Sequence, residues 1–107
     1  MLGKYVINPS GSSQFHWTLK AGNGETILSS QLYASKQSAE HGIESCRANS
    51  SNDERFSRLQ SKDDQPYFVL KAANGEPIGT SQMYSSESAR DSGIASCKEN
   101  GQAETKD

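Results

Sequence analysis

The chain contains an internal repeat, and no other feature constrains its fold as strongly. When the 107-residue sequence is shifted by 51 positions, residues 19–49 align with residues 70–100 without a gap, and 16 of these 31 positions are identical. Such self-similarity indicates a tandem duplication. A unit of about fifty residues is marginally stable alone, whereas two units can share one core. We therefore predict a single pseudo-twofold domain over 1–107. It comprises repeat 1 (3–49), a polar linker (50–53), repeat 2 (54–100) and a disordered tail (101–107).

Each repeat has the pattern of three strands followed by one helix. Residues 15–21 alternate apolar and polar side chains, and this period of two is typical of a half-buried strand. In the second repeat, Phe68, Leu70 and Ala72 alternate in the same way with Tyr67, Val69 and Lys71. Ser35 and Ser86 stand where a helix N-cap is expected. Apolar or small side chains follow at helical spacing, namely Ala39, Ile43 and Cys46, and then Ala89, Gly93, Ile94 and Cys97. We predict an α+β fold of two tandem βββα repeats, forming one antiparallel six-stranded sheet with two helices packed on one face.

The hairpin between the second and third strands can be predicted from strand parity. Leu19 and Ile27 should both face the core, and residues that are directly opposite in a hairpin share a face. A two-residue Asn23-Gly24 loop would place them on opposite faces. A three-residue loop, 22–24, pairs Leu19 with Ile27 and puts Gly24 where a left-handed residue is required. We expect the same loop at residues 73–75.

One glycine and one tyrosine recur at each helix. Gly42 and Gly93 lie within the helices, where glycine costs roughly 1 kcal/mol relative to alanine, so we expect another element to approach closely there. Tyr33 and Tyr84 precede the N-caps by two residues and could fold back onto the first turns of the helices.

The charge composition excludes several classes of partner. Eleven Lys and Arg against 13 Asp and Glu give a formal net charge of −2, with a pI near 5.6, so we expect no nucleic-acid partner. The longest apolar run has four residues, 67–70, far below the roughly 20 that span a bilayer. We expect no membrane partner, a cytoplasmic location, and a monomer whose two repeats form an intramolecular pseudo-dimer.

The recurring motifs resemble those of the YegP-like proteins, small bacterial proteins of uncharacterised function. The resemblance rests on three motifs that are present in both copies: Leu-Lys-Ala-x-Asn-Gly-Glu-x-Ile, Ser-Gln-x-Tyr and Gly-Ile-x-Ser. The resemblance implies one sheet built from both units, with the C-terminal helices exchanged between them, and no established activity. Two positions depart from the family pattern. Cys46 and Cys97 stand where valine is common, and Arg90 stands where repeat 1 has Ala39, so we expect unequal exposure of the two helices.

The two cysteines allow two interpretations. Cys46 and Cys97 occupy equivalent positions and could form a redox pair or an oxidant sensor across the pseudo-symmetry axis. However, both lie on the apolar stripe of a helix, where a free cysteine packs as a small hydrophobe. We favour packing and keep a thiol-based redox or stress-sensing protein as the alternative function.

The histidines predict neither a metal site nor a catalytic site. His16 and His41 lack counterparts in the other repeat, and His41 and Cys46 point about 140° apart around a helix. A catalytic nucleophile would also need an orienting acid and an oxyanion site, and the sequence pattern indicates neither. We expect solvated histidines, no cofactor and no metal. Trp17 and Phe68 are expected in the core rather than in a base-stacking platform.

The sheet face opposite the helices is the remaining candidate site. A recurring Lys, Glu and Gln accompanies each hairpin, as either a recognition patch or a simple cross-strand charge pair. We predict a non-enzymatic interaction or accessory module that binds an unidentified protein or small molecule. The candidate binding residues are His16, Thr18, Lys20, Gln31, Val69, Lys71 and Gln82.

Overall fold

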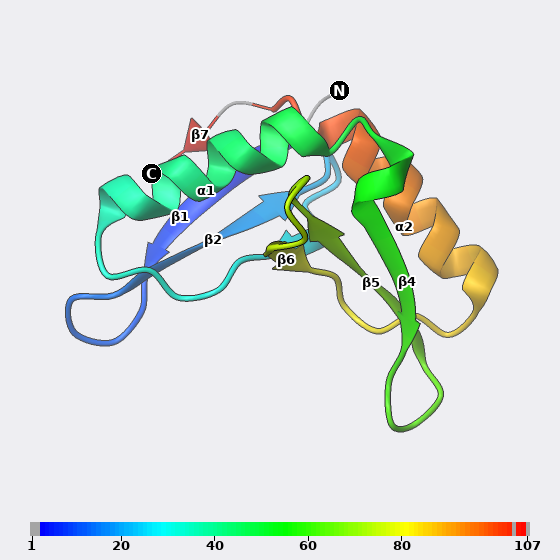
Figure 1. The fold of residues 1–107 in the computed structure, drawn as a ribbon. Coiled ribbons are helices and arrows are strands. Elements are labelled where there is room, and N and C mark those ends of the chain that lie inside the picture. Colours follow the sequence, from blue (N-terminus) through cyan, green and yellow to red (C-terminus); the bar gives the residue numbers. More distant parts are fainter. Residues whose placement is uncertain (1–2, 104, 107) are drawn as a thin grey trace.

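A computed structural model describes residues 3–103 and 105–106, and it has the predicted α+β architecture. Repeat 1 contains β1 (Lys4–Pro9), β2 (Phe15–Lys20), β3 (Thr26–Ser29) and α1 (Lys36–Asn49). After a single 3-10 turn, η1 (Asp53–Arg55), repeat 2 supplies β4 (Phe56–Gln60), β5 (Pro66–Lys71), β6 (Pro77–Thr80) and α2 (Glu87–Asn100). Figure 1 shows the elements in chain order.

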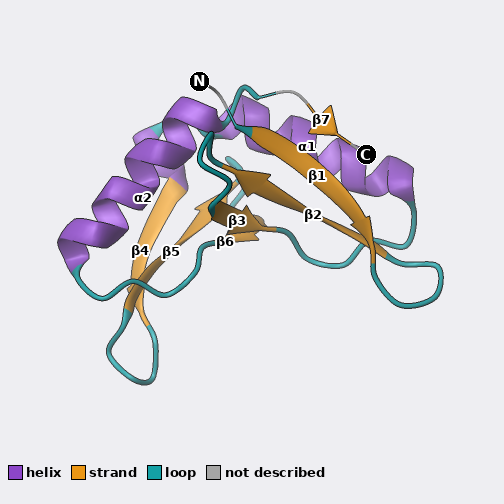
Figure 2. Ribbon diagram, turned by 180° about the vertical axis from the view of Figure 1, so that it is seen from behind, coloured by secondary structure: helices purple, strands orange, loops and turns teal. Residues whose placement is uncertain are grey.

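The sheet joins the two repeats through their third strands. Its order is β4-β5-β6-β3-β2-β1-β7, in which β3 pairs with β6 at Ser29 and Thr80. Figure 2 looks onto the strands with α1 behind them, and the molecule forms an arch whose two feet are the β1–β2 and β4–β5 loops. The six predicted strands are antiparallel to their neighbours, so the predicted sheet and helix layer are confirmed.

A seventh strand corrects the prediction of a disordered tail. β7 (Thr105–Lys106) pairs in parallel with β1, and Ala103 is completely buried. The guanidinium of Arg47 holds this segment by donating to the Ala103 carbonyl oxygen at 2.8 Å and to the Thr105 hydroxyl at 3.0 Å. Low hydropathy suggested disorder, but one buried alanine and a tertiary guanidinium contact order the segment. Residues 104 and 107 of the predicted tail lie outside the described residues.

The linker is also an ordered part of the domain. Ser50 is completely buried, and its N–H donates to the Cys46 carbonyl at the end of α1. The side chain of Ser50 occupies the space where a Cβ on Gly101 would lie, so the C-terminal ends of the two helices meet there. The linker is therefore polar but contributes a residue to the interior, which composition could not indicate.

Each helix packs across both repeats. Both N-caps are confirmed, because the Ser35 and Ser86 side chains accept from the Ser38 and Ala89 N–H groups. α1 contacts β1 and β2 of its own repeat as well as β5 and β6, and α2 contacts β5 as well as β2 and β3. The implied exchange of helices is therefore found in part, because each helix bridges the seam and contacts strands of both repeats.

The core lies between the helices and the sheet. Trp17 and Phe68 are completely buried, as predicted, and so are the side chains of Tyr5, Leu19 and Leu28. Ring pairs extend this core, with Tyr5 edge-on to Trp17 at 5.5 Å and Phe68 stacked on Tyr84 at 6.3 Å.

The predicted three-residue hairpin loop is confirmed, but its register is not. The Ala21 N–H donates to the Glu25 carbonyl, and Gly24 has a φ of +89°. A bulge between Leu19 and Lys20 then shifts the ladder, so Leu19 lies opposite Leu28 rather than Ile27. The parity argument assumed a regular ladder, whereas the bulge allows Ile27 and Leu28 both to be buried.

Tyrosine rings explain the glycines inside the helices. A Cβ on Gly93 would lie 2.6 Å from Cζ of Tyr84, and one on Gly42 would lie 2.8 Å from Cζ of Tyr33 and 2.9 Å from Nε1 of Trp17. The predicted close approach and the predicted folding back of the tyrosines are therefore the same contact.

The two repeats differ at the outer end of their cores. Arg90 is 8% exposed and takes the position of the fully buried Ala39, and its Nε lies 3.2 Å from Asp91. Arg58 takes the position of Ile7 and reaches the same carboxylate at 3.4 Å. Repeat 2 thus ends in a charged cluster where repeat 1 ends in apolar side chains, in line with the predicted inequality of the helices.

Candidate functional site

The sheet face opposite the helices carries most of the predicted binding residues. His16, Thr18 and Lys20 alternate with buried residues along β2, and Val69 and Lys71 do so along β5. All five are half-buried. The strands β3 and β6 separate the two groups, so the structure places them on one face but not in one cluster. We call the face formed by these five residues and Lys4 the open face.

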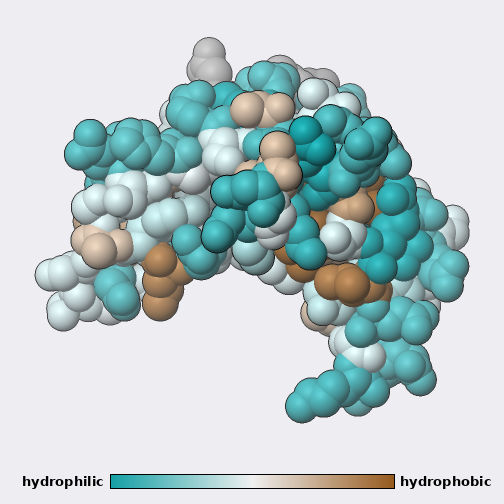
Figure 3. Space-filling view, in the orientation of Figure 1, coloured by the Kyte–Doolittle hydropathy of each residue, from teal (hydrophilic) through white to brown (hydrophobic). Residues whose placement is uncertain are grey.

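The charges on the sheet are all positive. None of the described Asp and Glu residues lies in β1 to β6, whereas these strands contain Lys4, Lys20, Arg58 and Lys71. Lys4 lies directly opposite Lys20 in the ladder, an arrangement of like charges that destabilises a sheet. The carboxylates of the described residues are confined to the helices, η1 and the hairpin loops. The space-filling view shows the hydrophilic surface and the hollow between the two feet of the arch (Figure 3).

The predicted cross-strand pair of Lys20 and Glu25 does not form. The three-residue loop places Thr26 opposite Lys20, and Nζ of Lys20 donates to the Thr26 hydroxyl at 3.2 Å. Glu25 instead turns to the helix side of the sheet, where it lines a cleft. The loop geometry that parity predicted therefore also separates the lysine from the glutamate.

The histidines lie in different environments. His41 is exposed, whereas His16 is half-buried and its Nδ1 is buried without a hydrogen-bond partner. The neighbouring Thr18 hydroxyl is likewise buried and unpartnered. The prediction of solvated histidines therefore fits His41, whereas Nδ1 of His16 is shielded from solvent.

The two predicted glutamines lie on different sides of the sheet. Gln31 lines a small hollow of about 220 Å³ at the seam, together with Ser29 and Pro77. Ser29 lies opposite Thr18 and Pro77 opposite Lys71, so this hollow opens on the same side as the open face. Gln82 instead lines a larger cleft of about 400 Å³. Because Gln82 follows the end of β6, alternation along that strand could not place its side chain.

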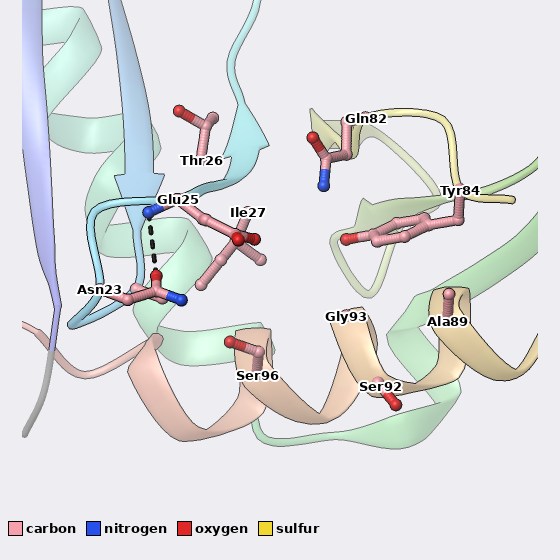
Figure 4. A pocket seen from close by; sticks show the side chains of 11 residues that line it. Asn23, Glu25, Thr26, Ile27, Gln82, Tyr84, Ala89, Ser92, Gly93 and Ser96 are labelled. Atoms are coloured by element: carbon pink, nitrogen blue, oxygen red, sulfur yellow. Dashed lines mark hydrogen bonds between the residues drawn. The ribbon is translucent and has the colours of Figure 1, made fainter.

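The larger cleft is assembled from both repeats, and we call it the cross-repeat cleft. Repeat 1 contributes its β2–β3 hairpin, and repeat 2 contributes the loop after β6 and one face of α2 (Figure 4). The lining residues are Ala21, Asn23, Glu25, Thr26, Ile27, Gln82, Tyr84, Ala89, Ser92, Gly93 and Ser96. Sequence reasoning singled out Glu25 and Gln82 as recurring positions but could not show that members from different repeats meet.

Tyr84 is the central polar group of this cleft. Its hydroxyl and the Glu25 carboxylate point toward one another in Figure 4. Burial raises the pKa of Tyr84, a hydrogen bond with Gln82 lowers it, and the charges of Cys97 and Glu25 raise it further. The tyrosine therefore stays protonated at neutral pH and can both donate and accept a hydrogen bond.

The cysteines are buried within the core. Cys46 and Cys97 are completely buried and unbonded, and the Tyr5 hydroxyl lies 3.1 Å from Sγ of Cys46. Burial raises the pKa of Cys46 to about 11 and raises that of Cys97 as well, with the charge of Cys46 as a second cause. A sensing thiol needs exposure and a lowered pKa. These thiols are instead buried and have raised pKa values, which favours a role in packing.

Within residues 3–103 and 105–106, no group of three His, Cys, Asp or Glu side chains could hold a metal ion. In the same part of the chain, no helix has the length and apolar character needed to cross a membrane.

Comparison with known sequences identifies a family match to both copies. A domain of unknown function, DUF1508, matches residues 11–56 and 61–107. A UPF0339 protein of Acinetobacter baylyi is 55% identical, covering 98% of this chain and 95% of the relative. The UPF0339 protein YegP of Escherichia coli K12 is 50% identical, covering 98% and 96%.

Solved structures of two relatives have the same fold. The solution structure of YegP from E. coli, described as a protein of unknown function, superposes with a TM-score of 0.91. It is 50% identical and is matched over 98% of this chain and 90% of the other. The solution structure of a UPF0339 protein from Shewanella oneidensis gives a TM-score of 0.90 at 51% identity, covering 98% and 91%.

Proposed function

The chain belongs to the YegP-like family of tandem DUF1508 proteins, and the relatives described above are uncharacterised. For this member we propose a non-enzymatic binding module that takes an acidic polypeptide segment. The partner lies on the open face. The observation that carries this proposal is the segregation of charge, with no described carboxylate in β1 to β6 and lysines on the open face. A protein with a net charge of −2 thus presents a locally cationic surface.

The opposed lysines support a binding role. Lys4 and Lys20 lie directly opposite each other, which costs stability unless a negative group lies between or near them. Lys71, the repeat equivalent of Lys20, supplies a second cationic position on the same face. Rim charges of this kind raise association rates and select partners of opposite charge.

Apolar side chains on the same face favour a polypeptide over a nucleic acid. Leu59 is 38% exposed and lies opposite Tyr67, which alternation places with Val69 on the open face. Protein interfaces combine such apolar contacts with a charged rim. The carboxylates around the remainder of the molecule repel a polyphosphate, because its charge extends far beyond the face.

The test measures binding of a fluorescent glutamate-rich peptide by anisotropy at low and high salt. We expect Lys20→Gln and Lys71→Gln each to weaken binding by about 3- to 10-fold, the range of one partly screened charge pair. Lys62→Gln, which removes the same charge from the β4–β5 hairpin loop, should leave binding unchanged. Equal losses in all three variants would contradict the proposal, as would tighter binding of a single-stranded oligonucleotide of equal charge.

A further inference from the structure

We propose that the cross-repeat cleft is a second and separate binding site, which takes a small organic cation carrying an ammonium or guanidinium group. This site lies on the helix side of the sheet and shares no residue with the open face. Its volume of about 400 Å³ lies within the usual 300–1,000 Å³ of small-molecule pockets.

The charge of the lining selects the class of ligand. Glu25 is the charged side chain of the cleft, and no Lys, Arg or His of the described chain lines it. An anion would meet the Glu25 carboxylate at close range without a compensating cation. An ammonium or guanidinium group instead donates charge-assisted hydrogen bonds, which are about twice as strong as neutral ones.

Neutral polar groups beside Glu25 can accept further hydrogen bonds from a bound cation. The Tyr84 hydroxyl faces Glu25, and Gln82 lies beside it in Figure 4. The Asn23 side-chain oxygen accepts from the Glu25 N–H at 3.0 Å and so fixes the hairpin that carries the carboxylate. A cation held by Glu25 would therefore face the Tyr84 hydroxyl oxygen, which can accept from its remaining N–H groups.

Packing holds the tyrosine in place before a ligand binds. Tyr84 stacks on Phe68 at 6.3 Å with an interplanar angle of 12°. Its ring end rests on Gly93, where the missing Cβ makes the space. Ile27 and Ala89 add apolar surface for the carbon chain of the ligand. Such preorganisation lowers the entropy lost on binding.

The duplication offers a matched control for Glu25. Glu76 occupies the equivalent hairpin position in repeat 2, but it does not line the cross-repeat cleft. Glu25→Gln and Glu76→Gln therefore remove the same charge from the same local structure. Both glutamates are exposed, so neither change disturbs the core.

Amide NMR titration with 1,4-diaminobutane and 4-aminobutylguanidine tests the proposal, with 1,4-butanediol and succinate as neutral and anionic probes. The cations should shift the amides of residues 23–27 and 92–96, whereas the diol and succinate should not. Glu25→Gln should weaken binding by about 10-fold or more, and Glu76→Gln should leave it unchanged.

Three outcomes would overturn the assignment. They are shifts spread over the helix carboxylates rather than the cleft, equal losses in the two glutamine variants, and no shift at millimolar cation. The Lys71→Gln variant of the open face serves as a further control, whereas Lys20 contacts Thr26 of the cleft and is not used. Lys71→Gln should bind the cation like the unmodified protein, so failure of either proposal can be distinguished from failure of the other.

Discussion

The effect of Gly93→Ala on stability should depend on Tyr84. The substitution should destabilise the protein when Tyr84 is present and stabilise it when Tyr84 is absent. In a helix interior, glycine to alanine normally adds about 1 kcal/mol to the free energy of unfolding. Here the added Cβ would lie 2.6 Å from Cζ and 3.2 Å from Cε1 of Tyr84. Overpacking of this kind costs about 1–3 kcal/mol. The net result in the unmodified protein is therefore a loss of about 0–2 kcal/mol.

The Tyr84→Ala background removes every one of the nearest atoms that the new Cβ would meet. Gly93→Ala should then raise the free energy of unfolding by about 1 kcal/mol, the helix-propensity gain alone. The coupling energy of this double-mutant cycle is accordingly about 1–3 kcal/mol. Gly42 provides a contrast, because Nε1 of the buried Trp17 also lies 2.9 Å from its added Cβ. There, Tyr33→Ala should relieve the clash only in part.

Urea unfolding of the four proteins of the Gly93 cycle measures the coupling directly, provided that the m-values agree. A coupling energy near zero, with Gly93→Ala equally harmful in both backgrounds, would show that the tyrosine is not the reason for the helical glycine. The same result would remove the argument that Gly93 holds Tyr84 in the cleft.

Three further expectations concern the thiols, an exposed carboxylate and the C-terminal segment. Native Cys46 and Cys97 should react with a thiol reagent at neutral pH only as fast as the protein unfolds, because both are buried. The pKa of Cys46 is about 11 in the folded protein against an ordinary 9.0, so its contribution to stability is complete below pH 9 and is lost as the pH rises to about 11. Urea unfolding at alkaline pH should show a smaller loss for Cys46→Ala. Lys98 lowers the pKa of Asp53 through a 2.7 Å contact, so Lys98→Ala should raise that pKa in a carboxyl NMR titration, and an unchanged value would exclude the contact in solution. A chain ending at Gln102 should lose about 1–3 kcal/mol of stability in urea, because it lacks the buried Ala103 and its hydrogen bonds; full stability would show that the segment does not dock.

Much of the local structure follows from the sequence because its causes are local. The N-caps at Ser35 and Ser86 and the left-handed Gly24 depend on residues within a few positions of each other. The apolar stripes of the helices and the alternation in β2 and β5 depend only on helical and strand periodicity. The duplication then implies that two such units share one core, which the seam between β3 and β6 confirms.

The candidate sites were less predictable than the fold. Alternation placed Lys20 and Lys71 on the open face, but it misassigned Gln82, which follows the end of a strand. The bulge beside Leu19 displaced the predicted register, because parity assumes an uninterrupted ladder.

The amino-acid sequence alone defines the repeating unit, namely its strands, its helix, its turn and the side chains that each unit buries. Which residues of the two units come together depends instead on the tertiary arrangement. Glu25 and Tyr84 come from different repeats but line one cleft, and β7, which follows α2, pairs with β1. Contacts between residues about 60 to 100 positions apart depend on how a twisted sheet joins two units at one seam. The periodicity of side chains within one unit does not predict that arrangement.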